Sequence, residues 1–118
     1  MKIIYNSIFS TPRFIDQPYA WIQHTPFANY LIEVLNPETF VELGSHSGNS
    51  YFSFCQVVDN LQISTKCYAI DTWKGDEQSG YYGDEVFRRV NKINNNHFSH
   101  FSVLMRMTFD EGLSLIHI

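Results

Sequence analysis

The sequence has few of the residues that mark several large classes of protein. Its two cysteines, Cys55 and Cys67, lack C-x-x-C spacing, which excludes a zinc knuckle and a thioredoxin-type motif. Eight Lys and Arg stand against twelve Asp and Glu, a net charge of −4 that leaves no basic field for nucleic acid or an acidic membrane surface. No apolar run reaches membrane-spanning length, and the apolar start at residues 1–5 is broken too soon for a signal peptide. We therefore expect a cytoplasmic protein with two buried, reduced thiols.

The composition is sufficient for one small folded domain. The chain has 118 residues, of which 44% are hydrophobic and 16% aromatic, enough to build a core. Thr25 and Pro26 are favourable residues at a helix start. The apolar face of that helix, recurring at helical spacing, is predicted to be Phe27, Tyr30, Leu31, Val34 and Leu35. Further patterns predict strands at residues 39–43, 67–71 and 101–107, and helices at 50–59 and 84–93. This alternation is typical of a parallel sheet with crossover helices.

The turn after the first predicted strand is the main candidate for a binding site. Glu42 ends the apolar run, and Gly44 and Gly48 follow with three residues between them. Such a turn can present backbone N–H groups to a ligand, although a strand–turn–helix corner without a ligand has the same pattern. Asp71 ends the second predicted strand, where a carboxylate can accept both ribose hydroxyls.

Two polar segments allow more than one interpretation. The long loop at residues 71–83 carries Trp73, Tyr81 and Tyr82 and is either a binding element or a surface loop whose aromatics fold back on the core. The helix at residues 84–93 carries Arg88 and Arg89 in i,i+4 relation to preceding acids, which predicts a solvated face rather than a site. Three consecutive asparagines at residues 94–96 are expected to end that helix.

The last eleven residues conflict with the pattern that precedes them. Thr108 and Glu111 form a capping-box pattern that announces a helix, but Gly112 follows at once and leads us to expect that the helix is not built. Residues 113–118 match a hexapeptide encoded by a common transposase adapter used in DNA library preparation. The alternative is a short fourth strand at residues 115–118.

Four stretches in the same order resemble a known family. Residues 21–28, 41–48, 69–76 and 106–111 are similar to class I S-adenosylmethionine-dependent methyltransferases, specifically methyltransferase family 24. The resemblance runs from about Trp21 to Gly112. It implies a Rossmann-like parallel sheet of which residues 1–112 are the N-terminal, cofactor-binding half. It also implies a small-molecule substrate and, in a longer parent protein, a neighbouring glycosyltransferase domain.

The resemblance also assigns roles by position. It implies S-adenosylmethionine contacts from the first-motif acid, the glycine turn and helix start, the end of the second strand and the end of the third strand: Glu42, Gly44, Ser45, His46, Ser47, Gly48, Asn49, Ser50, Asp71, Thr72, Trp73, Met107 and Thr108. No catalytic residue is assigned and no metal ligands are expected. We expect His24 to have a packing or capping role and His46 to position the backbone.

The expected reaction is methyl transfer from S-adenosylmethionine to a small or saccharide-linked acceptor. We expect the 118-residue chain to be inactive alone, because the pattern of strands covers only part of the family's sheet. Two alternatives stay open. One is a nicotinamide-dependent Rossmann oxidoreductase, and the other is a non-catalytic fragment that needs a partner chain.

Overall fold

The computed structural model describes residues 5–117. Residues 1–4 and 118 lie outside the described residues. They include the first four residues of the apolar start at 1–5 and the last position of the alternative fourth strand. No helix within the described part of the chain is long and apolar enough to cross a membrane. In chain order the elements are η1 (Asn6–Phe9), η2 (Ile22–His24), α1 (Thr25–Leu35), β1 (Thr39–Leu43), α2 (Asn49–Leu61), β2 (Lys66–Asp71), β3 (Gly75–Asp76), β4 (Gly80–Tyr81), α3 (Glu85–His97), β5 (Ser102–Arg106) and α4 (Phe109–Ile116).

Three parallel strands form the sheet in the order β1-β2-β5. Leu43 pairs with Ile70, and Asp71 pairs with Arg106, so all three strands end at the same edge. This confirms the predicted α/β class with a parallel, Rossmann-like sheet. The short strands β3 and β4 form a separate antiparallel hairpin in the loop after β2.

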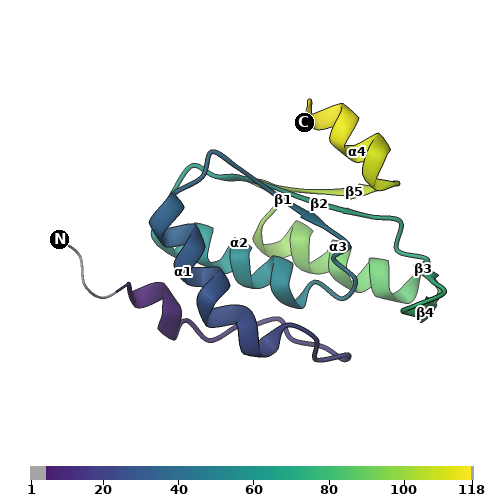
Figure 1. Cartoon of the computed structure of the whole chain (residues 1–118), viewed down its shortest axis with the longest axis horizontal. Helices are drawn as coiled ribbons and strands as arrows, with labels where there is room; N and C mark the ends of the chain where they lie inside the picture. The colour runs from purple at the N-terminus through teal and green to yellow at the C-terminus, as the bar shows by residue number, and fades with distance from the viewer. Residues whose placement is uncertain (1–4, 118) are drawn as a thin grey trace.

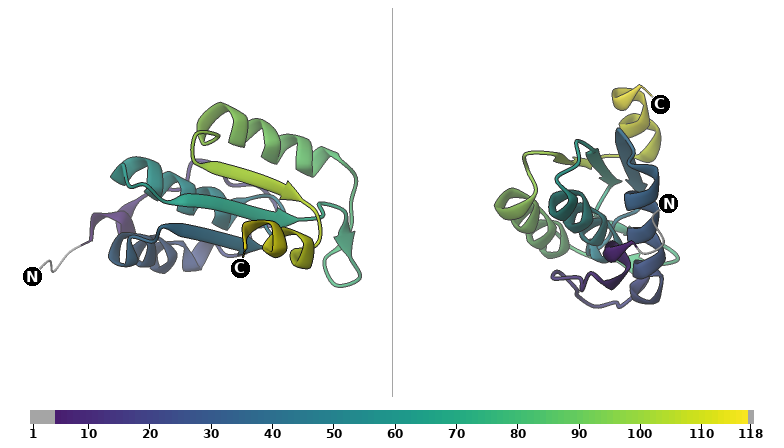
Figure 2. Two further views of the ribbon diagram at one scale, coloured as in Figure 1. Left: turned by 90° about the horizontal axis from the view of Figure 1, so that it is seen from above. Right: turned by 90° about the vertical axis from the view of Figure 1, so that its left-hand side faces the viewer.

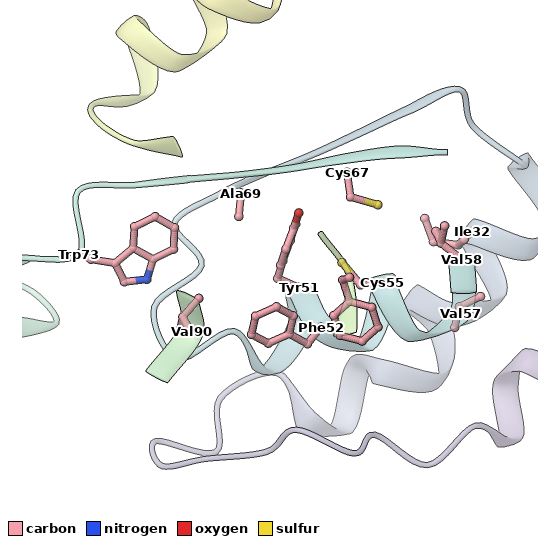
Figure 3. Packing of buried hydrophobic residues seen from close by; sticks show 11 residues of the cluster. Ile32, Tyr51, Phe52, Cys55, Val57, Val58, Cys67, Ala69, Trp73 and Val90 are labelled. Atoms are coloured by element: carbon pink, nitrogen blue, oxygen red, sulfur yellow. The ribbon is translucent and has the colours of Figure 1, made fainter. Parts of the chain in front are cut away.

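The helices cover the two faces of the sheet unequally. Helices α1, α2 and α3 lie on one side, and α4 lies alone on the other (Figure 1, Figure 2). The core is the interface between the sheet and α2, with Ala69 and Cys67 above Tyr51, Phe52 and Cys55 (Figure 3). β1 is an edge strand that pairs with β2.

The predicted apolar face of α1 is wrong. The helix buries Ala28, Asn29 and Ile32, whereas Phe27 is 64% exposed and Leu35 is 66% exposed. A polar network selects this orientation: Asn29 Nδ2 donates to the carbonyl of Ser7 at 3.3 Å, and its Oδ1 accepts from Ser53 at 3.0 Å. A buried amide must keep its partners, so Asn29 faces α2 and the larger apolar residues turn outward.

Helix α3 extends four residues beyond its predicted end. Asn94 is buried inside the helix and its Nδ2 donates to the carbonyl of Ser102 at 3.2 Å, so it joins α3 to β5 instead of stopping the helix. The helix ends at His97, where Phe98 packs into the core. The local preference of asparagine for turns is overridden here by a tertiary hydrogen bond.

The expectation that no helix follows Thr108 is also wrong. Thr108 Oγ1 accepts from the backbone N–H of Glu111 at 3.3 Å, and α4 runs from Phe109 to Ile116. Leu115, at which the alternative fourth strand was to begin, therefore lies in a helix. Gly112 lies inside α4 and does not end it. A Cβ at this position would lie 2.6 Å from Ile70 Cδ1 on β2. The glycine lets the helix rest closely on the sheet.

Candidate functional site

The turn after β1 is shaped by its two glycines. Gly44 has φ +82° and Gly48 has φ +83°, a region that residues with a Cβ rarely adopt. The N–H of Gly48 donates to Ser45 O at 2.8 Å, which closes the turn, and a Cβ on Gly48 would lie 2.6 Å from the ring of Phe52. Around Gly44 a Cβ would meet only Phe109, at 3.7 Å. Gly48 is thus required for packing, while Gly44 leaves open space beside the turn.

His46 occupies the middle of this turn and connects it to the next strand. Its φ is +46°, its N–H donates to Asp71 Oδ2 at 3.0 Å, and its carbonyl accepts from the indole N–H of Trp73 at 2.8 Å. Its ring lies against Tyr82, with ring centroids 4.7 Å apart. The main-chain groups of His46 therefore join the turn to β2 and to Trp73, while the backbone-positioning role expected of this histidine stays a prediction.

Asp71 holds the carboxyl end of β2 in place. Oδ2 accepts from His46, and Oδ1 accepts from the N–H of Trp73 at 2.8 Å. A carboxylate oxygen has two acceptor positions, so each oxygen of Asp71 retains one. The side chain can therefore fix the turn and accept ligand hydroxyls together.

Glu42 is an enclosed carboxyl group on the edge strand. Its Oε2 accepts from Ser50 Oγ at 2.7 Å, while Oε1 is buried without a hydrogen-bond partner among the described residues. Burial raises the pKa of Glu42, the hydrogen bond from Ser50 and the nearby Ser45 hydroxyl lower it, and the charge of Asp71 raises it further. Burial thus opposes the charged form of Glu42, and a cation beside Oε1 would offset this cost.

Two cavities meet at the turn. The first, of about 480 Å³, extends along the free side of β1 past Glu42 and Phe40 to Trp21. The second, of about 380 Å³, lies over Asp71 and extends to Tyr82 and Thr108. Both include Gly44, His46 and Ser79 in their walls, so they adjoin. Burial, aided by Asp71 and Asp76, raises the pKa of Tyr82 to about 12, so its phenol stays a hydrogen-bond donor at neutral pH.

Most of the residues predicted for the site line these two cavities. The wall of the first includes Glu42, Gly44, Ser45, His46, Ser47, Asn49 and Ser50, and that of the second includes Gly44, His46, Asp71, Thr72 and Thr108. Trp73, Gly48 and Met107 line neither. Trp73 is fully buried in the core, and Met107 donates its N–H to Asp71 O at 3.1 Å, so these residues support the walls from behind.

Arg89 was missed by the sequence prediction. Arg89 was expected only to lie on a solvated face of its helix. In the structure its Nη1 donates to Ser47 O at 3.2 Å and its Nε lies 3.4 Å from Asp16 Oδ2. It thus joins α3 to the glycine turn and to the N-terminal segment. Its partners are more than forty residues away or outside any predicted element, so no local pattern could have found them.

Asn49 has a structural function that its position in the turn did not reveal. Its Nδ2 donates to the carbonyls of Asp16 at 2.7 Å and Pro18 at 3.0 Å, and its Oδ1 accepts from the N–H of Asp16 at 2.9 Å. The side chain therefore anchors the segment that forms one wall of the first cavity.

The described part of the chain contains no cluster of residues that could ligate a metal ion. Within residues 5–117 no group of three or more His, Cys, Asp or Glu could hold a metal ion. The polar groups that line the two cavities are carboxylates, hydroxyls, amides, one imidazole and the backbone of the turn.

Comparisons with known proteins agree with this arrangement. A family model described as a methyltransferase domain matches residues 41–118, from the middle of β1 onward. The uncharacterized protein y4gI of Sinorhizobium fredii (strain NBRC 101917 / NGR234) is 46% identical over 108 residues, which cover 92% of this chain and 12% of that protein. The chain thus spans about an eighth of the length of this relative. No solved structure matches the chain.

Proposed function

The chain belongs to the methyltransferase family whose domain model it matches, and from this premise we propose that it binds S-adenosylmethionine as methyl donor. The acceptor in this proposal is a small or saccharide-linked molecule. When bound, the cofactor would supply an activated methyl group. An acceptor oxygen or nitrogen would bond to the methyl carbon as the carbon–sulfur bond breaks, giving S-adenosylhomocysteine and a proton. We place the reaction in the cytoplasm, where the free thiols of Cys55 and Cys67 stay reduced.

The residues present fit this cofactor. Asp71 retains an acceptor position on each oxygen and faces the second cavity, which suits a ribose diol. Thr72 and Thr108 line the same cavity and would flank the base. Glu42 has a buried oxygen without a partner beside the first cavity, which suits the ammonium of the methionine part. The observation that carries the proposal is the junction of these two cavities at Gly44 and His46.

The charge of the cavity walls discriminates between cofactors. The residues lining both cavities include the carboxylates of Glu42, Asp71 and Asp76 and no Lys or Arg. S-adenosylmethionine carries a sulfonium and an ammonium group, which these carboxylates attract, whereas the pyrophosphate of NAD would be repelled. The wall charges thus favour the methyl donor over the nicotinamide alternative.

Calorimetric titration of the chain with S-adenosylhomocysteine and, separately, with NAD tests this proposal. We expect saturable binding of the first and none of the second at matched concentrations. Asp71→Ala should weaken binding at least about tenfold, the equivalent of one good hydrogen bond to a charged group. Glu77→Gln, a change at an exposed position outside both cavities, is the matched control. Binding of NAD alone would favour the oxidoreductase instead.

The free edge of β1 supports a second part of the proposal, that turnover needs further polypeptide beside this strand. Leu43 at the end of β1 is 46% exposed, and the outward face of α1 leaves Phe27, Val34 and Leu35 at 64%, 41% and 66% exposure. An unpaired edge flanked by apolar side chains is a surface that a further strand can cover. We therefore expect the 118 residues to bind cofactor without turning it over. Methyl transfer by the purified chain at a rate above that of heat-denatured protein would contradict this part alone.

A further inference from the structure

A hollow with aromatic walls, separate from the two cavities at the glycine turn, adjoins the first cavity. It has a volume of about 440 Å³ and lies before helix α1. Its lining consists of Tyr19, Trp21, Ile22, Gln23 and His24. Tyr19 is 60% exposed and Trp21 is 61% exposed, so both rings present area to solvent beside a recess. Exposed aromatic rings at the mouth of a cavity are a common feature of binding surfaces.

The backbone of Trp21 is fixed by hydrogen bonds, and its ring lies edge-on to His24 with ring centroids 5.2 Å apart. Trp21 has φ +71°, a conformation that costs energy for any residue with a Cβ and that often occurs at functional sites. Its carbonyl accepts from the N–H of His24 at 3.0 Å and from Thr25 Oγ1 at 3.3 Å. The preceding segment is anchored by Asn49 at the carbonyl of Pro18. An exposed tryptophan on a preorganised backbone binds a ligand with little loss of conformational entropy.

Trp21 lines the first cavity as well as the hollow. A molecule resting on this ring would therefore lie next to the cavity that contains Glu42 and would reach toward the turn at Gly44. In a transferase, this is the relation that an acceptor has to its donor. The hollow is thus placed for the second substrate rather than for the cofactor.

The chemistry of the lining selects the occupant. It contains no Asp, Glu, Lys or Arg, so a phosphate or another ionic group would have no partner of opposite charge. It does contain two aromatic faces, a phenol hydroxyl, an amide and an imidazole. Aromatic faces stack on the C–H faces of a pyranose ring, and the amide, phenol and imidazole can bond with its hydroxyls. We propose that this hollow is the acceptor subsite for a neutral saccharide, a proposal that rests on the proposed methyl transfer.

The two tryptophans of the chain allow a direct test by NMR. Trp21 lies at the hollow, whereas the indole N–H of Trp73 is bonded to His46 at the cofactor turn. Two indole signals are therefore expected, and Trp21→Phe assigns them. Titration of the wild-type chain with maltose and with methyl α-L-rhamnopyranoside should move the Trp21 signal saturably and leave Trp73 nearly still. Titration with S-adenosylhomocysteine should move the Trp73 signal, because the Trp73 indole is bonded to the cofactor turn.

Substitutions of Trp21 distinguish the contribution of its ring to saccharide affinity from that of its backbone conformation. Trp21→Asn removes the platform but tolerates positive φ, and should weaken saccharide binding about tenfold. Trp21→Phe should retain a part of the affinity. Phe27→Ala, at another exposed aromatic outside the hollow, should leave it unchanged. A Trp21 signal unmoved by both sugars, while S-adenosylhomocysteine moves Trp73, would overturn the subsite and leave the cofactor proposal standing. If S-adenosylhomocysteine moves neither signal, the cofactor proposal fails, and with it the assignment of the hollow to an acceptor.

Discussion

The main-chain N–H of His46 donates to Asp71 Oδ2 at 3.0 Å, across the boundary between β1 and β2. The carbonyl of the same residue accepts from Trp73, which itself donates its N–H to Asp71 Oδ1. The turn that would cradle a cofactor and the acid that would bind its ribose are therefore one hydrogen-bonded unit. A change in Asp71 must disturb both the fold and the ligand.

Asp71→Asn should lower stability and ligand affinity together. An amide can accept from one of the two N–H groups only, and its NH₂ then faces the other. We expect a loss of about 1–2 kcal/mol in the free energy of unfolding, measured by urea denaturation, and weaker binding of S-adenosylhomocysteine. A variant that keeps full stability but loses binding would mean that the carboxylate serves the ligand alone.

Glu42→Gln should separate stability from binding. Because burial raises the pKa of Glu42 in the folded state, its carboxyl favours folding when protonated at low pH, and this contribution is lost as pH rises through the folded-state pKa. Glutamine stays neutral and can still accept from Ser50. The variant should therefore equal the wild type near pH 4 and be more stable at pH 8.

Urea denaturation from pH 4 to pH 8 measures this difference in stability, and calorimetry at pH 7 measures the affinity for S-adenosylmethionine. The affinity of Glu42→Gln for S-adenosylmethionine should be lower than that of the wild type, because the variant lacks the carboxylate charge that attracts the ammonium group. Equal stability of the two proteins across the whole pH range would show that burial does not raise the pKa of Glu42.

The two glycines of the turn should differ in their cost when replaced. Gly44→Ala meets open space, so its cost is that of the left-handed backbone, about 1–2 kcal/mol. Gly48→Ala adds a contact of 2.6 Å with the buried Phe52 ring, and should cost about 3 kcal/mol in all. Thermal unfolding of both variants checks the order, and a smaller loss for Gly48→Ala would contradict the packing at this corner.

Gly112→Ala should destabilise the chain, although alanine favours a helix over glycine by about 1 kcal/mol. The new methyl group would press on Ile70, whose nearest carbon lies 2.6 Å away. Ile70→Ala removes this carbon together with Cγ2 and Cγ1, which lie at 2.7 Å and 3.0 Å, so the cost of Gly112→Ala should fall by about 0.5–3 kcal/mol in this background. A double-mutant cycle in urea measures the coupling. Additive effects would mean that α4 does not rest on β2.

The predictable parts of this fold are those that depend on short-range patterns. β1 was predicted with its exact bounds, because an apolar run lies between Pro37 and Gly44. The start of α4 is signalled by Thr108 and Glu111, and the error was to take Gly112 for a stop. Its role depends on Ile70, which is forty-two residues away and gives no local signal.

The unpredicted parts depend on polar groups that meet across the chain. Asn29 sets the orientation of α1, Asn94 extends α3, and Arg89 reaches the glycine turn. A sequence pattern weighs apolar periodicity, whereas burial of an amide is decided by the partners it finds. The position of Asp71 and Glu42 at the cavities could be predicted, since carboxyl ends of neighbouring parallel strands share an edge.

Asn49 provides the sharpest test of how the N-terminal segment is held. Asn49→Ala removes three hydrogen bonds to Asp16 and Pro18, and should cost about 2–3 kcal/mol. Asn49→Asp keeps the acceptor for the Asp16 N–H but turns an anionic oxygen toward two carbonyls, so its loss should be at least as large. Asn96→Ala, at an exposed position on α3, is the control. Hydrogen exchange at the Asp16 amide should become faster in both Asn49 variants, and the Trp21 indole signal should shift, because the anchored segment carries this ring. If Asp16 exchanges at the wild-type rate in Asn49→Ala, the segment is held by Arg89 rather than by the helix start.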